Sequence, residues 1–316
     1  MSVTPRYAYL GPAGTFSEAA ARLMVAPGDG ELVPVVDVPT ALGAVRSGEA
    51  DYAVVAIENT VEGGVTATLD TLAEGSPLVI LGEVVLPVSF ELVARPGTAL
   101  ADIARVGAHS HAWAQVRRWA NATLPGVTFV TASSNAAAAQ AVARGTFEDG
   151  LGYEAALAPP GTGAALGLTV LLDGIADNPN AATRFVRVGR PEAVPEPTGH
   201  DKTTLNVFLP TDRAGALLEM LEQFAVRGVN LSRIESRPRM DRPGEYSFSI
   251  DALGHIAEAR MSEALIGLKR TCPLVVFLGS YPAADPTPTP VAPGNADASF
   301  TDAQRWVRGL LDGATD

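Results

Sequence analysis

Cysteine and histidine are scarce in this 316-residue sequence, and their scarcity excludes several kinds of site. The single cysteine, Cys272, cannot form an internal disulfide or build a cysteine-ligated metal site alone. Of the four histidines only His109 and His111 are close in sequence, and no carboxylate or thiol near them completes a set of metal ligands. The sequence also lacks a Rossmann fingerprint, a P-loop and a nucleophile elbow. We therefore expect no metal and no cofactor.

Basic residues and long apolar runs are also scarce. Lysine and arginine total 23 against 35 acidic residues, so the formal net charge is −12, which disfavours nucleic acid and anionic membranes as partners. No apolar stretch is long enough to cross a bilayer, and the N-terminal MSVTPRYAYLG lacks the features of a signal peptide. We expect a cytoplasmic protein that holds any anionic substrate at a local positive site.

Apolar residues make up 47% of the chain, and the length predicts about two domains. Strand-like and helix-like segments alternate over residues 1–189, which predicts an α/β domain with at least one mostly parallel sheet. Three prolines in residues 190–201 indicate a linker. Residues 202–282 follow the order βαββαβ of a ferredoxin-like domain.

The remaining residues, 283–316, form a tail rich in proline and alanine. Residues 283–298 are expected to be disordered, and residues 300–311 to form a short helix with Thr301 as its cap. We expect this helix to dock on its own domain rather than on a partner. Its apolar stripe would consist of Phe300, Val307, Leu310 and Leu311.

Polar segments beside predicted strands are candidates for a small-anion site. Residues 11–17 (GPAGTFS) lead into a helix whose N-terminal N–H groups suit a carboxylate, with Thr15 as cap and Glu18 completing a capping box. Residues 58–63 (ENTVEG) follow a buried strand, a position where open α/β sheets bind ligands. Glu58 and Glu62 there could form an acid–base pair. A capped turn and a solvated loop explain the same patterns.

Three later segments also carry polar groups. Residues 109–115 (HSHAWAQ) contain a weak metal signal or a structural histidine, and residues 133–137 (SSNAA) contain polar groups or a plain helix cap. In residues 183–185 (TRF), Arg184 could clamp a carboxylate or be an exposed arginine on an edge strand. Thr183 would need strong polarisation to act as an acid, because its hydroxyl has no pKa near neutrality.

Taken in order, these five segments resemble the prephenate dehydratase family. Residues 215–218 (GALL), 228–231 (GVNL) and 235–238 (ESRP) resemble an ACT regulatory domain, and the likeness spans residues 5–282. It implies a bilobed, type II periplasmic-binding-protein-like catalytic domain with its site between the lobes. The implied reaction converts prephenate to phenylpyruvate, carbon dioxide and water without a cofactor.

The resemblance also implies which residues act. Thr183, Arg184 and Phe185 would be catalytic, with Thr183 most tied to the chemistry and Phe185 in the cleft wall. The substrate-binding residues would be Thr15, Ser17, Asn59, Thr60, His109, Gln115, Ser133 and Ser134. Phenylalanine would inhibit by bridging the ACT domains of neighbouring chains in a homodimer or homotetramer. Its contacts would be Gly215, Ala216, Leu217, Leu218, Asn230, Leu231, Glu235, Ser236, Arg237 and Pro238.

The sequence departs from the family pattern at three positions. Ala108 stands in place of a hydroxyl residue before His109, Asn135 in place of threonine, and Ala214 in place of proline. About ten residues precede the first motif, too few for a chorismate mutase domain, so we expect a monofunctional enzyme. Arogenate dehydratase is an alternative, because arogenate differs from prephenate only by an amine for a keto group. A non-catalytic amino-acid sensor, which would not need TRF, and an extracellular solute-binding protein, which would need a signal peptide, are the others.

Overall fold

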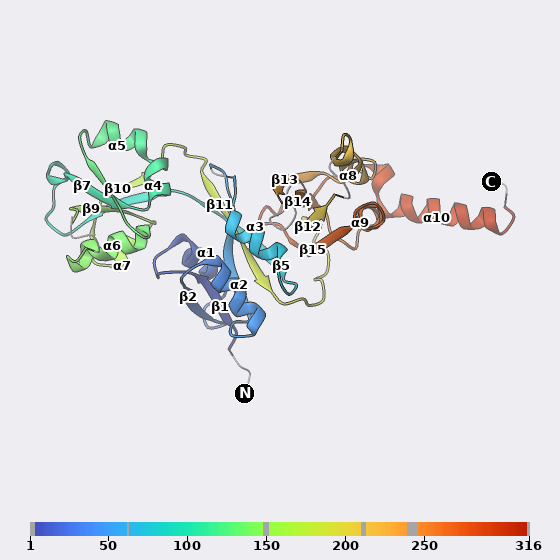
Figure 1. Ribbon diagram of the computed structural model, residues 1–316, viewed down its shortest axis with the longest axis horizontal. Helices are drawn as coiled ribbons and strands as arrows, with labels where there is room; N and C mark the ends of the chain where they lie inside the picture. The colour runs from blue at the N-terminus through green and yellow to red at the C-terminus, as the bar shows by residue number, and fades with distance from the viewer. Residues whose placement is uncertain (1–3, 62, 148–151, 210–212, 239–245, 315–316) are drawn as a thin grey trace. The chain divides into compact units, whose positions relative to one another are not determined.

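The computed structural model in Figure 1 describes residues 4–61, 63–147, 152–209, 213–238 and 246–314. The chain divides into two compact units, Met1–Thr68 with Val84–Phe185 and Leu69–Glu83 with Val186–Asp316. The second unit therefore includes residues 69–83, which precede the expected linker by more than a hundred positions. The domain limits at residues 189, 201 and 282 stay predictions.

The first sheet is built mainly from the N-terminal segments. β1 pairs in parallel with both β2 and β3, which confirms the predicted parallel α/β character. In sheet order the strands are β2 (Glu31–Val35), β1 (Arg6–Leu10), β3 (Tyr52–Asn59), β11 (Ala182–Gly189) and β5 (Val79–Pro87), with β4 (Gly63–Gly64) paired to β3. The accompanying helices are α1 (Phe16–Met24), α2 (Val38–Ser47) and α3 (Thr66–Ala73).

The second sheet of this unit is mixed. β7 pairs in parallel with β8 and β9, whereas β6 pairs antiparallel with β9 and β10. In sheet order the strands are β10 (Thr169–Ile175), β6 (Phe90–Ala94), β9 (Ala155–Ala158), β7 (Arg105–Ala108) and β8 (Thr128–Thr131). The helices are α4 (Ser110–Gln115), α5 (Arg117–Thr123), α6 (Asn135–Arg144) and α7 (Thr162–Ala165), with a 3₁₀ turn η1 (Leu100–Asp102).

Side-chain caps set where two of these helices begin. Thr15 Oγ1 accepts from Glu18 N at 3.3 Å and so caps α1 as predicted. Glu18, however, accepts from Gly14 N at 2.6 Å, which differs by one residue from an ordinary capping box. Ser134 Oγ accepts from Ala137 N at 3.0 Å and caps α6. Both helices therefore start beside the polar segments singled out in the sequence.

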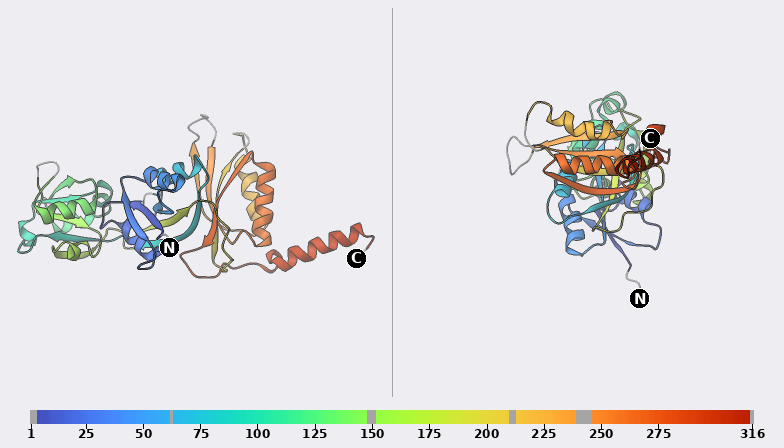
Figure 2. Two further views of the ribbon diagram at one scale, coloured as in Figure 1. Left: turned by 90° about the horizontal axis from the view of Figure 1, so that it is seen from below. Right: turned by 90° about the vertical axis from the view of Figure 1, so that its right-hand side faces the viewer.

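The second unit contains an antiparallel sheet with two helices on one face. Figure 2 shows α8 and α9 lying together on that face, and apolar side chains such as Val207, Phe224 and Leu268 fill the space between. The elements are β12 (Asp201–Phe208), α8 (Ala216–Ala225), β13 (Leu231–Pro238), β14 (Tyr246–Leu253), α9 (Ala259–Thr271) and β15 (Leu274–Pro282). The sheet order β13-β14-β12-β15 confirms the predicted ferredoxin-like plan.

The tail differs from the sequence expectation. Residues 283–292 are held by hydrogen bonds, with Ala283 N donating to His200 O and Thr289 N donating to Gly199 O. A 3₁₀ turn η2 (Pro293–Asn295) leads into α10 (Asp297–Leu311). Thr301 is not its cap, since its hydroxyl donates to the Asp297 carbonyl inside the helix. Asp297 also accepts from Ala259 N at 2.7 Å, but no described residue of α10 is buried, so docking on its own domain is limited to the first turn.

Within the described part of the chain, no helix is both long enough and apolar enough to cross a membrane.

Candidate active site

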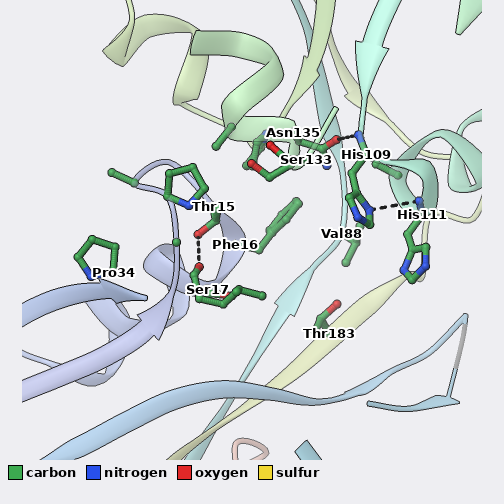
Figure 3. A pocket seen from close by; sticks show the side chains of 18 of the residues that line it. Thr15, Phe16, Ser17, Pro34, Val88, His109, His111, Ser133, Asn135 and Thr183 are labelled. Carbon is green, nitrogen blue, oxygen red and sulfur yellow. Dashed lines mark hydrogen bonds between the residues drawn. The ribbon is translucent and has the colours of Figure 1, made fainter. Parts of the chain in front are cut away.

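A pocket of about 690 Å³ lies in the first unit and draws its lining from both sheets. Most of the expected catalytic and substrate-binding residues line it, whereas Thr60, Arg184 and Phe185 do not. Figure 3 shows the Thr183 side chain pointing from its strand towards the pocket, with Thr15 and His109 on other sides. The expected residues in the lining are Thr15, Ser17, Asn59, His109, Gln115, Ser133, Ser134 and Thr183.

Thr183 and Asn59 form a direct polar contact at the pocket wall. Asn59 Nδ2 donates to Thr183 Oγ1 at 2.8 Å. The amide of Asn59 is itself oriented, because its Oδ1 accepts from Val61 N at 2.8 Å. Since the amide nitrogen donates to the hydroxyl oxygen of Thr183, the proton of that hydroxyl is left to be donated elsewhere.

Thr60 has a structural contact instead of a place in the lining. Its hydroxyl accepts from Ala182 N at 2.9 Å, and its own N–H donates to Ala182 O at 3.0 Å. These two bonds attach the loop after β3 to the start of β11. The assignment of Thr60 to substrate contact therefore does not match the structure, and its side chain instead holds the strand that carries Thr183.

The other two residues of TRF leave the pocket because side chains alternate along a strand. Arg184 is 5% exposed, and its Nε donates to Glu58 Oε2 at 3.0 Å. It is therefore neither the expected carboxylate clamp in the pocket nor an exposed edge arginine. Phe185 is 2% exposed and belongs to a core cluster against which Phe16 packs. It supports the wall from beneath and does not form it. Glu62 lies outside the described residues.

The histidine and serine segments meet across the pocket. Asn135 Oδ1 accepts from His109 N at 2.8 Å and so joins the start of α6 to the end of β7. His109 Nδ1 accepts from His111 N at 3.3 Å, which caps α4. Asn135, a departure from the family pattern, thus has a defined structural contact. The structural-histidine interpretation fits better than metal binding, because the backbone N–H of His111 occupies the Nδ1 lone pair of His109.

Gln115 has an unmet polar atom beside the pocket. Its Oε1 is buried and has no hydrogen-bond partner among the described residues. Buried polar atoms are nearly always satisfied in folded proteins, so an unsatisfied acceptor in a pocket wall indicates a place for a donor on a ligand.

The electrostatics of the pocket differ from the sequence expectation. No lysine or arginine occurs among its lining residues in the described ranges, so the expected positive site is not made by such side chains. The positive end of α1 faces the pocket instead, since Thr15, Phe16 and Ser17 all line it. Backbone N–H groups at a helix N-terminus suit an anion.

Sequence reasoning missed several apolar lining residues. Apolar positions beside strands have the same signature whether they face a core or a cavity, so no sequence signal separated them. They include Phe16, Pro34, Val35, Val36, Val88 and Phe90.

The expected effector residues lie on α8 and β13 of the second unit. Gly215 precedes α8 with a φ of +87°, and Leu217 and Leu218 are exposed on its first turn. The ESRP residues Glu235, Ser236, Arg237 and Pro238 end β13, and Asn230 and Leu231 begin it. Arg237 does not wait with a free guanidinium, because it pairs with Asp70 of α3.

Comparisons with known proteins agree with this architecture. The family model described as prephenate dehydratase matches residues 7–193. A curated prephenate dehydratase of Amycolatopsis methanolica is 46% identical over 309 residues, covering 98% of each chain. A solved prephenate dehydratase from Arthrobacter aurescens, in complex with L-Phe, is 53% identical with a TM-score of 0.90, covering 98% of this chain and 100% of that one.

A further solved structure, of a quorum-quenching acylase, is 30% identical with a TM-score of 0.76, covering 88% of this chain and 98% of that one. The fold is thus compatible with more than one reported activity. The match of the family model over more than half of the chain, and the full-length identity to curated relatives, nevertheless lead to one assignment: this chain belongs to the prephenate dehydratase family.

Proposed function

We propose that this protein converts prephenate to phenylpyruvate, carbon dioxide and water, and that phenylalanine inhibits it. The observation that carries the proposal is the hydrogen bond from Asn59 to Thr183 at the wall of the pocket. It leaves a hydroxyl donor aimed at a ligand, in a chain of the prephenate dehydratase family.

The reaction needs little electron management from the protein. The bond between the ring and its carboxylate breaks, and its electron pair forms a ring double bond as carbon dioxide leaves. The opposite carbon–oxygen bond breaks in the same process, and the departing hydroxide takes a proton to become water. The ring becomes aromatic, so the protein has to hold the substrate and ease the departure of the hydroxyl.

Thr183 is the proposed donor to that leaving hydroxyl. The Asn59 amide donates to its oxygen, which polarises the O–H bond and directs the proton away from Asn59. A well-placed proton donor contributes about 10²–10⁴-fold in rate. Arg184 and Thr60 act indirectly, because their contacts with Glu58 and Ala182 hold β11 against β3.

The two carboxylates of prephenate would meet different groups. The N-terminus of α1, at Thr15 and Ser17, supplies N–H groups and a partial positive charge for one of them. His109, Ser133 and Ser134 would hold and orient the other. The unpartnered Oε1 of Gln115 would accept a hydrogen bond from the substrate hydroxyl, which fixes which face of the ring meets Thr183.

The proposed inhibition rests on the second unit. The Arthrobacter aurescens relative was solved in complex with L-Phe, and this chain is 53% identical to it. β13 is the edge strand of its sheet and carries ESRP, and a sheet edge is a common place for two copies to pair. Exposed Leu217 and Leu218 lie on the first turn of α8, as expected of an effector contact between chains in a homodimer or homotetramer.

The direct test is phenylpyruvate formation from prephenate by the purified protein, followed by ultraviolet absorbance. Turnover that falls on addition of phenylalanine is the expected result, and no turnover under mild neutral conditions would rule the proposal out. Arogenate, assayed in parallel for phenylalanine formation, separates the two dehydratase activities. A cytoplasmic location stays a prediction.

A further inference from the structure

The segment between α3 and β5 is attached to the sheet of the second unit at several points. Lys202 Nζ pairs with Glu83 Oε1 at 2.7 Å. Gly279 lies so close to Ile80 that a side chain there would meet its backbone. The third attachment is the pair between Arg237 and Asp70.

The Arg237–Asp70 pair has the geometry of a strong interaction. Arg237 Nη2 lies 2.7 Å and 2.8 Å from the two carboxylate oxygens of Asp70, and Arg237 Nε lies 3.1 Å from one of them. Such forked contacts combine charge with two parallel hydrogen bonds. The Arg237 side chain is 21% exposed, so solvent screens the pair only in part.

The helix that carries Asp70 leads back to the candidate active site. α3 begins a few residues after Asn59, and its Thr68 hydroxyl donates to the Ala56 carbonyl of β3 at 2.5 Å. Thr68 is fully buried. One helix is therefore bound at one residue to the strand that holds Asn59, and two residues later to the ESRP arginine.

We propose that Asp70 is a regulatory positioning residue that competes with phenylalanine for Arg237. The inference rests on the proposed function, because Arg237 is an expected effector contact. The carboxylate of phenylalanine and that of Asp70 would require the same guanidinium donors, and two carboxylates at one site repel each other. The pair belongs to the effector-free state, and the effector breaks it.

The sign of the effect follows from linkage. An interaction present only in the effector-free state opposes effector binding by its own free energy, and removing it must strengthen binding by the same factor. Coupling energies of this kind correspond to roughly fivefold or more in affinity. Loss of the pair also loosens α3, so inhibition and binding should shift together.

The test is the variant Asp70→Asn in the full-length protein. We expect phenylalanine to inhibit it at about one-fifth of the wild-type concentration, and to bind about fivefold more tightly in equilibrium dialysis, consistent with the coupling energies above. Turnover without phenylalanine should stay close to wild type. Asp70→Glu keeps the charge and should restore most of the wild-type response. Asp302→Asn, which breaks an exposed pair with Arg305 on α10, is the matched control and should change neither quantity.

Unchanged or weaker binding and inhibition in Asp70→Asn would overturn the inference. A merely structural role for the pair would lower thermal stability without sharpening the response to phenylalanine. If the wild-type protein turned over prephenate but did not respond to phenylalanine, this inference would fall and the catalytic proposal would stand. If it did not turn over prephenate, the dialysis measurement would still decide whether Asp70 opposes phenylalanine.

Discussion

Replacing Asn59 with aspartate tests the proposed chemistry at one atom. The two side chains have the same shape, and Val61 N can still donate to the retained oxygen. The change turns the donor that lies 2.8 Å from Thr183 Oγ1 into a carboxylate oxygen, which only accepts at neutral pH. The Thr183 hydroxyl would then donate to this carboxylate, and its proton would point away from the ligand.

The expected loss can be worked out from the two interactions involved. A hydrogen bond to a charged group contributes about 1.5–3 kcal/mol, which opposes turning the hydroxyl back. Losing one positioned donor to a developing oxyanion costs about 2.7–4 kcal/mol in a comparable site. These two figures describe the same lost donation, so we expect about 3–4 kcal/mol in all. Because about 1.36 kcal/mol is a factor of ten, kcat should fall about 10²–10³-fold.

The assay is steady-state phenylpyruvate formation over a range of prephenate concentrations. Thr183→Ala removes the same donor and should lose a similar factor in kcat with a much smaller change in KM. The double variant should be no worse than either single one, because both changes remove one interaction. Asn121→Asp adds the same charge on α5 and is the control for charge alone. A kcat within tenfold of wild type for Asn59→Asp, or a double variant with additive losses, would refute the reasoning.

Three further predictions concern stability and regulation. Glu58→Gln leaves the buried Arg184 without its carboxylate partner, so we expect unfolding to be easier by about 1–3 kcal/mol, measured by urea denaturation, with a smaller loss of kcat than in Asn59→Asp; unchanged stability would contradict the pairing. Gly215→Ala places a side chain at φ +87°, which costs about 1–2 kcal/mol. It should weaken inhibition by phenylalanine in a titration, and an unchanged inhibition curve would count against the effector site. Burial raises the pKa of the Cys272 thiol, so it should react slowly with a disulfide reagent until the protein unfolds. Since the folded pKa lies above the unfolded one, the folded state binds the proton more tightly, and stability should fall as pH rises past the unfolded pKa of about 8.5.

Local sequence signals predicted many of the elements correctly. Thr15 and Ser134 cap α1 and α6 as expected of hydroxyl residues before helices, and α3 spans the predicted residues. Short apolar strands such as β7 and β9 were not assigned, because four apolar residues fit a buried strand or part of a buried helix equally well. The order of motifs indicated the family, and the comparisons support that assignment.

The sequence by itself determined the kinds of groups available to this protein. Its hydroxyls, amides and helix starts occur in an order typical of prephenate dehydratases, and those chemical identities depend only on the chain. Tertiary structure decided which of them meet. Asn59 and Thr183 are 124 positions apart, and their contact depends on β3 and β11 belonging to one sheet. Which face of β11 turns to the pocket also followed from packing: Thr183 lines the cavity and Arg184 is buried against Glu58, because a strand places neighbouring side chains on opposite faces and only the assembled core selects between them.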